Sequence, residues 1–175
     1  MLTVKELSHD EIDVLTDYWM NADKDYLLGM GVDLTKLPAR EDFKAMLEEQ
    51  LRATYADKKA YALIWLLNGV PAGHSNINKI KFGEEAYKHL HIWNAADRNK
   101  GYGIKWLKQS IPYYFKNFGL QHLFCEPYAL NPAPNHTMQK LGFEFVDEYI
   151  TTPGWINFEQ PVKLWKLSKD IFEKW

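Results

Sequence analysis

A glycine-bearing turn between a strand-like and a helix-like run constrains the fold of this chain more than any other stretch. The turn reads Arg-Asn-Lys-Gly-Tyr-Gly over residues 98–103, after the run 88–93 and before the run 104–117. Glycine lets the backbone approach a ligand closely, and the first turn of a helix presents unpaired N–H groups that attract an anion. Because Arg98 and Lys100 add positive charge, the pattern predicts a phosphate cradle; the alternative is a turn in which glycine only bends the chain.

The length of 175 residues suggests one domain, residues 1–175, with a core of its own. The chain has 7 Trp, 10 Tyr and 9 Phe, enough rings to fill a core and still line a pocket. The net charge is −2 and no block of basic residues occurs, so we do not expect nucleic acid as a partner. A slightly acidic chain is compatible with a cationic substrate such as an amine.

Cys125 is the only cysteine, which excludes an internal disulfide and indicates a reducing, cytoplasmic compartment. It lies in an apolar run, so we expect an inert core thiol; a nucleophile is the alternative. No apolar run approaches the roughly 20 residues that span a bilayer, and no signal peptide is visible, so no membrane partner is expected. The aromatic segment 171–175 has two candidate partners, the body of the chain or a second copy in a homodimer.

Apolar periodicity and turn residues predict strands and helices in a mixed order. The expected strands are residues 1–7, 60–67, 70–80, 87–93, 120–128, 143–150 and 162–168, and the expected helices are one capped by Ser8, 40–57, 101–117 and 136–141. Residues 21–38 show no clear period, and residues 131–135 read as a turn with two prolines. Hairpins come first and strand–helix–strand units later, which indicates an α+β fold with a mixed sheet and helices on its faces.

Local signals agree with these elements. Ser8 and Glu11 form a capping-box pattern, residues 68–69 are an Asn-Gly hairpin signal, and Gly73 is expected to mark a bulge. Pro112 falls inside the third helix and is expected to kink it or to begin its last segment.

Two motifs together resemble a known family. Arg98-x-x-Gly101-x-Gly103 matches the acetyl-CoA pyrophosphate loop of the GNAT N-acetyltransferase superfamily. About thirty residues downstream, the segment 131–143 resembles the Asn-x-x-Ser…Glu-Lys-Leu-Gly-Phe segment of its ribosomal-protein (RimJ/RimL-like) branch. The resemblance covers roughly residue 60 to the C-terminus and, more weakly, the first helices.

The resemblance implies a mixed, mostly antiparallel sheet splayed between the strand that ends at Trp93 and the strand 120–128. Acetyl-CoA would lie in that V as cosubstrate, with its pantetheine arm along the first strand and its pyrophosphate on the glycine turn. The residues expected to contact acetyl-CoA are Trp93, Asn94, Ala95, Arg98, Asn99, Lys100, Gly101, Tyr102, Gly103, Asn131 and Asn135.

The chain departs from the family pattern at two positions. The Ser that follows Asn-x-x in relatives is Pro134 here, and the Tyr that many members carry four residues before Gly-Phe is Met138. Neither side chain can protonate the leaving CoA thiolate. Tyr128, Asn135, His136 and water remain the alternatives for that role.

Acetyl transfer needs a group that takes a proton from the amine. His89 and His91 share one face of their strand, and histidine titrates in a useful range; the alternative is that both are satisfied polar groups on a half-exposed face. Glu126 is the rival, because burial near the end of an apolar strand would favour proton uptake; its alternative is an ion pair with a lysine. The catalytic candidates are therefore Glu126, His91 and His89.

Two further stretches are candidates for the acceptor site. Trp155 lies in a loop that relatives place over the acceptor, and Tyr26 could meet a cationic acceptor; closing the core and solvent exposure are the alternatives. The expected substrate-binding residues are Tyr26, Tyr128 and Trp155. No histidines pair with a carboxylate at metal-ligand spacing, so we assign no metal.

The sequence thus predicts an enzyme that transfers the acetyl group of acetyl-CoA directly to a primary amine, in a ternary complex. The acceptor, a protein N-terminus or a small amine, is left open. Two alternatives remain: an acyl-CoA-binding or sensing module without transfer activity, suggested by the residues at positions 134 and 138, and a site for another phosphate ligand.

Overall fold

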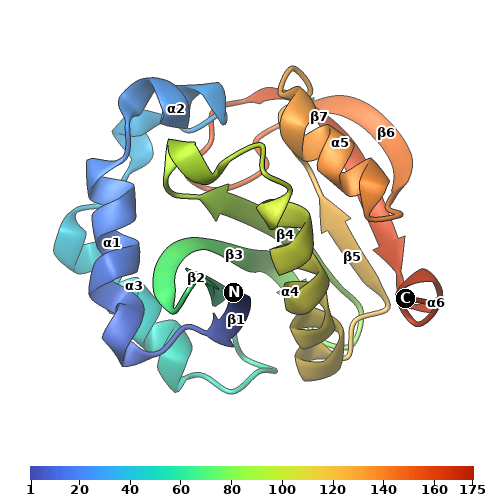
Figure 1. The fold of residues 1–175 in the computed structure, drawn as a ribbon, viewed down its shortest axis with the longest axis horizontal. Helices are drawn as coiled ribbons and strands as arrows, with labels where there is room; N and C mark the ends of the chain where they lie inside the picture. Colours follow the sequence, from blue (N-terminus) through green and yellow to red (C-terminus); the bar gives the residue numbers. More distant parts are fainter.

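One mixed sheet of seven strands forms the centre of the computed structural model, which describes all 175 residues (Figure 1). The strand order is β1-β2-β3-β4-β5-β7-β6, and every neighbouring pair is antiparallel except β4 and β5. The strands are β1 (Leu2–Glu6), β2 (Tyr61–Leu67), β3 (Val70–Lys81), β4 (Glu85–Ile92), β5 (His122–Cys125), β6 (Glu144–Thr151) and β7 (Gln160–Ser168). The expected mixed, mostly antiparallel sheet is confirmed.

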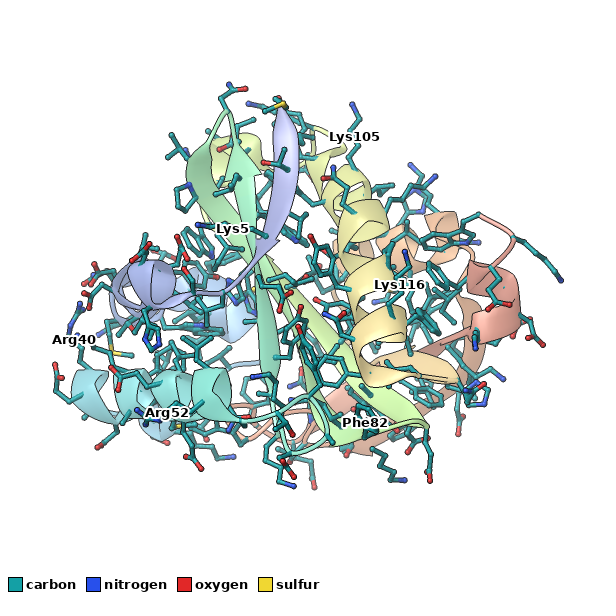
Figure 2. All side chains as sticks on the ribbon, turned by 90° about the horizontal axis from the view of Figure 1, so that it is seen from below. Lys5, Arg40, Arg52, Phe82, Lys105 and Lys116 are labelled. Carbon is teal, nitrogen blue, oxygen red and sulfur yellow. The ribbon has the colours of Figure 1, made fainter.

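Helices cover both faces of the sheet. They are α1 (Ile12–Asn21), α2 (Lys24–Gly29), α3 (Arg40–Arg52), α4 (Tyr102–Phe118), α5 (Pro132–Lys140) and α6 (Lys169–Phe172). The side view in Figure 2 shows α1 and α3 on one side of the sheet and α4 on the other. α2 packs with the first group, and α5 and α6 pack with α4. None of these helices combines the length and the apolarity that crossing a bilayer requires.

Two apolar clusters join the layers. Under α4, Trp65 and Trp106 are fully buried and stack with ring centroids 5.2 Å apart. On the opposite face, Leu15 and Trp19 of α1 pack with Ile64. Burying one such side chain stabilises the fold by roughly 1.5–3 kcal/mol. Because successive side chains of β2 alternate between the two clusters, this strand fixes both layers, as its near-continuous apolar sequence indicates.

The sheet is split between β4 and β5. The two strands pair only over Glu85–Tyr87 and His122–Phe124. Beyond Tyr87, β4 continues to Ile92 without a partner on that side, so the strands diverge as Figure 1 shows. The V that the family resemblance implies is therefore present.

The local turn signals are confirmed. The carboxylate of Glu11 accepts hydrogen bonds from the backbone N–H and the hydroxyl of Ser8. Asn68 and Gly69 both have positive φ angles, 53° and 83°, which a two-residue hairpin requires. Gly73 borders a bulge in β3, and a Cβ there would lie 2.6 Å from the carbonyl oxygen of His91. Glycine is required at position 73 because β3 and β4 approach so closely there.

Some expected boundaries are wrong. The turn expected at residues 131–135 is the first half of α5, because Pro132 and Pro134 lie in its first turn, where backbone N–H groups need no partner. The strand expected over 120–128 is only four residues long, because the chain leaves the sheet after Cys125. The second expected helix ends at Arg52, five residues early. Residues 21–38, which are long for a plain loop, are partly helical and contain α2 and a 3-10 turn. Pro112 does not interrupt α4, which continues to Phe118.

The C-terminal segment packs on the body of the chain. The ring of Phe172 in α6 stacks on that of Phe115 in α4, with centroids 4.5 Å apart and planes within 6°. Lys169 N–H donates to the carbonyl of Gln121, which anchors the start of α6. The body of the chain is thus a partner of this segment.

Lys88 lies at the apex of the split and is an unusual core residue. It is the first residue of β4 beyond the paired stretch, its side chain is 1% exposed, and Nζ makes no hydrogen bond of ordinary geometry. Burial lowers the pKa of Lys88, and the neighbouring Cys125 thiol offsets only part of that effect. The thiol itself is buried, which raises the pKa of Cys125, in keeping with an inert core cysteine.

We expect Lys88→Met to stabilise the protein. An unpaired buried polar group costs about 1–3 kcal/mol, and Met fills similar space without it. Because the pKa of Lys88 is lower in the folded protein, the unfolded chain binds the extra proton between the two pKa values, so wild-type stability rises with pH there by up to about 1.4 kcal/mol per pH unit.

The gain in unfolding free energy for Lys88→Met should therefore be largest at neutral pH and shrink toward pH 10, measured by urea unfolding across pH. The exposed Lys116→Met on α4 is the control and should change stability by less than about 0.5 kcal/mol. A loss of stability in Lys88→Met would show that the amine has a partner.

Candidate functional site

A continuous cleft of about 1080 Å³ passes through the split in the sheet. At one end it meets the glycine turn and α5, and at the other it reaches the space between α3 and the sheet. Most of the expected site residues lie along it. Those lining the cleft are Tyr26, His89, His91, Arg98, Asn99, Gly101, Tyr102, Gly103, Glu126, Tyr128, Asn131 and Trp155. Those that do not line it are Trp93, Asn94, Ala95, Lys100 and Asn135.

The glycine turn has the geometry of an anion site. Asn99 and Gly101 have φ angles of 59° and 74°, and Gly101 is the N-cap of α4. No side chain caps the helix and its first turn has no acidic residue, so the N–H groups there are free for a ligand. A Cβ at Gly103 would rest 3.5 Å from Ile92, so the helix start lies directly against the end of β4.

Arg98 connects the turn to both neighbouring elements. Nε donates to the carbonyl of Ile92 and an Nη donates to the carbonyl of Trp93, each at 3.1 Å. The guanidinium lies 3.5 Å over the ring of Tyr26 in α2. The face of the Tyr26 ring, which was expected to meet a cationic acceptor, is therefore packed against the guanidinium of Arg98. Lys100, by contrast, is exposed, with Nζ 3.5 Å from Asp97.

His91 belongs to a stacked histidine pair. Its ring is parallel to that of His74 at 4.7 Å, and Nδ1 lies 3.1 Å from the hydroxyl of Tyr18. The indole of Trp93 donates to Nδ1 of His74 at 2.7 Å. Burial lowers the pKa of His74 to about 3 and holds the pKa of His91 well below its usual value. Both rings are therefore neutral at physiological pH, as satisfied polar groups would be.

His89 lies on the same face, one step closer to the apex of the split. Nε2 is 3.2 Å from Oδ1 of Asn78, so the proton on Nε2 is donated there and Nδ1 carries a free lone pair. The ring is half-buried and lines the cleft. Burial lowers the pKa of His89 to about 4, with smaller contributions from Lys88 and Lys79. The ring is thus in its proton-accepting form at neutral pH.

Glu126 lies across the split on β5's continuation, held by two partners. Its side chain is 4% exposed, and one oxygen accepts from Lys79 Nζ at 3.0 Å. The other accepts from the hydroxyl of Tyr149. Burial and the adjacent Glu126 carboxylate raise the pKa of Tyr149, so that hydroxyl remains a donor. Glu126 thus forms an ion pair with a lysine, which is the alternative to a catalytic role.

The segment between β5 and α5 borders the cleft. Asn135 is engaged in holding the backbone: its amide donates to the carbonyls of Tyr128 and Asn131, and it accepts from the indole of Trp165. Tyr128 lines the cleft and its hydroxyl makes no hydrogen bond within the protein, and His136 lines the cleft at an exposed position. Asn131 is the N-cap residue of α5, makes no side-chain capping hydrogen bond, and also lines the cleft.

Sequence reasoning missed the wall formed by α3 and the floor formed by β3. Phe43, Met46 and Leu47 line the cleft, as do Asn76 and Asn78. The apolar period of α3 and the polar side chains of β3 were visible signals. Periodicity identifies a face of an element but not whether a protein core or a cavity lies opposite it.

The family model described as the acetyltransferase (GNAT) domain matches residues 2–144. A comparison with curated protein sequences gives no match. Several solved structures have the same fold. RimL, a ribosomal L7/L12 α-N-protein acetyltransferase in complex with coenzyme A, superimposes with a TM-score of 0.78 at 13% identity, covering 97% of this chain and 95% of that chain.

Two other solved structures carry different acceptors. Spermidine N-acetyltransferase from Vibrio cholerae, in complex with CoA and spermine, has a TM-score of 0.79 at 14% identity and covers 98% of each chain. The aminoglycoside acetyltransferase AAC(6')-Ib, in complex with coenzyme A and kanamycin, has a TM-score of 0.74 at 15% identity, with 99% of this chain and 98% of that chain covered.

Proposed function

The chain belongs to the GNAT acetyltransferase family, and on this premise we propose that it transfers the acetyl group of acetyl-CoA directly to a primary amine. The resemblance found in the sequence is confirmed, and RimL is among the structures with the same fold. The observation that carries the proposal is the split between β4 and β5. It leads from the uncapped start of α4 to a part of the cleft lined by the neutral side chains of His89 and His91. We treat residues 1–175 as one GNAT domain, since β7 completes the same sheet.

The residues of the turn and of β4 fit acetyl-CoA. The free N–H groups at the start of α4 and the backbone of residues 99–103 would hold the pyrophosphate. The edge of β4 beyond Tyr87 has no strand partner, so an extended pantetheine arm can pair with it as an added strand does. Arg98 would position the turn through the carbonyls of β4 while its charge remains close to the phosphates.

Bound acetyl-CoA supplies the activated thioester, and the chain supplies the proton transfers. The attacking amine must lose a proton, and we propose that His89 takes it, directly or through one water. Its Nδ1 is free, the ring borders the cleft, and the Asn78 contact fixes its tautomer. His91 and Glu126 are the alternatives: Nδ1 of His91 lies beside the hydroxyl of Tyr18, and both oxygens of Glu126 already accept from Lys79 and Tyr149.

We propose Tyr128 as the donor of a proton to the leaving CoA thiolate. Among the alternatives to Pro134 and Met138, Asn135 is committed to backbone carbonyls and His136 is exposed at the rim. Tyr128 lines the cleft, and its hydroxyl has no hydrogen-bond partner in the protein. An acyl-CoA-binding module without transfer remains the competing function, and release of free CoA in the presence of an amine separates the two.

The first prediction concerns the turn. Gly101→Glu should weaken acetyl-CoA binding by at least about 100-fold, because it places a carboxylate among the phosphate-binding N–H groups. Calorimetric titration measures this. Gly69→Glu is the matched control: it has the same positive φ and open surroundings, but lies in the β2–β3 hairpin, and should bind acetyl-CoA as the wild type does. Equal affinities in the two variants would mean that residues 98–103 are only a turn.

The second prediction concerns the amine proton. His89→Gln should lower kcat by about 10²–10⁴-fold with little change in acetyl-CoA affinity, and Glu126→Gln should lower it far less. Because the pKa of His89 is about 4, the acidic limb of kcat/KM that His89 causes should fall near pH 4 and vanish in His89→Gln. If Glu126→Gln instead removes that limb, Glu126 is the base.

The third prediction concerns the thiolate. Tyr128→Phe should reduce kcat by at least about tenfold while the Kd for CoA stays within a few-fold of the wild type. Tyr113→Phe on α4, outside the cleft, is the control and should keep full activity. Full activity in Tyr128→Phe would leave water as the proton donor.

A further inference from the structure

One part of the cleft lies between α3 and the sheet face that carries His89, and we call it the acceptor chamber. Its wall on one side is α3, its floor is formed by β2, β3 and β4, and the loop before β7 closes a third side. The chamber is lined by Phe43, Met46, Leu47, Gln50, Leu51, Ala62, Asn76, Asn78, His89 and residues 153–157.

The apolar face of α3 is only partly covered by the protein. The helix is amphipathic, yet none of its residues is buried. It is attached to α1, where Phe43 meets Trp19 edge-on at 6.5 Å and Lys44 pairs with Asp13 at 2.9 Å. Leu47 and Leu51 also pack against the α1 cluster but stay only partly buried, and these two side chains and the exposed Met46 line the chamber. An apolar ligand body would remove that surface from water, and the hydrophobic effect favours its binding.

No carboxylate is among the residues that line the chamber. The whole cleft is lined by only two carboxylates, Glu126 and Glu6. Glu126 is neutralised by Lys79 and also binds Tyr149. Glu6 is exposed, accepts a hydrogen bond from the hydroxyl of Tyr55 at 2.9 Å, and lies outside the lining of the chamber. An ammonium group that entered the chamber in addition to the reacting amine would lose its water without gaining a counter-ion, which is costly.

Neutral polar groups on the floor can receive one amine. Asn76 makes no side-chain hydrogen bond and lies opposite His89 in the β3–β4 register. With Nδ1 of His89 also free, two acceptors lie side by side below the split where the acetyl group would arrive. A single amine can therefore be held at the floor while its body extends toward α3.

We propose that the acceptor is a small primary monoamine with an apolar body, and that the chamber disfavours polyamines and aminoglycosides. This inference rests on the proposed function and deepens it. The solved structures with spermine and kanamycin share the fold. The lack of carboxylates in the chamber is what would make this chain bind such polycationic acceptors poorly.

A matched pair of amines tests the proposal. Hexylamine and hexamethylenediamine have the same chain and differ by one terminal ammonium group. We expect kcat/KM for hexylamine to exceed that for the diamine by about 100-fold, a ratio that corresponds to the loss of one unpaired ion's hydration. A peptide with an N-terminal phenylalanine and kanamycin complete the panel. Equal or higher kcat/KM for the diamine or kanamycin would overturn the charge argument, and a preference for the peptide would overturn the assignment to a small amine.

A matched pair of variants tests the cause. Met46→Glu places a carboxylate in the chamber at a side chain that is 42% exposed and therefore tolerant of the change. It should reduce the preference for hexylamine at least tenfold. Ala45→Glu adds the same charge on the exposed face of α3 and should leave the preference unchanged. If both variants shift the preference equally, overall charge and not the chamber sets selectivity, and the proposal is wrong.

Binding measurements separate this inference from the proposed function. Calorimetric titration of each amine into the CoA-loaded protein should show tighter binding of hexylamine, whether or not acetyl transfer occurs. Tighter binding without turnover would reject the transferase and keep the chamber assignment. Turnover combined with tighter binding of the diamine would reject the chamber assignment and keep the transferase.

Discussion

The end of hydrogen bonding between β4 and β5 after Tyr87 is the constraint on which the rest of the structure depends. Three paired residues hold the two halves of the sheet together, and the next residues on each side form the walls of a cleft. The same divergence leaves Lys88 at the apex with an unpaired amine, and it leaves one edge of β4 without a partner. A continuous sheet would pair the backbone groups along this edge of β4 but would have no site.

The two faces of the sheet have different electrostatic properties. On the α4 face, aromatic packing of the kind made by Trp65 and Trp106 supplies stability. On the other face, histidines and asparagines stand where a core would have apolar side chains, and burial keeps His74 and His91 uncharged. A floor of neutral polar groups can accept a proton or a hydrogen bond without attracting ions from solvent, which suits a reaction that requires an uncharged amine.

The sequence predicts the strand–turn–helix unit, the hairpin at residues 68–69 and the position of the split, because each depends on local residue types or on a family motif. It does not predict the start of α5, since Pro132 reads equally as a turn and as the first residue of a helix. Nor does it reveal that Glu126 meets Lys79 and Tyr149, or that α3 borders a cavity. Those facts depend on long-range packing. The reactive roles of His89, His91 and Glu126 stay predictions.

The stack of Arg98 on Tyr26 links the glycine turn at one end of the cleft to α2. Arg98 belongs to the turn beside α4 and also ties down the end of β4, whereas Tyr26 belongs to α2 next to the chamber. Removing the phenol ring would widen the cleft at α2 and leave the guanidinium with only its bonds to the carbonyls of Ile92 and Trp93. Tyr26 therefore joins α2 to the glycine turn, so a change of side chain at this one position alters the support of the turn and the width of the cleft together.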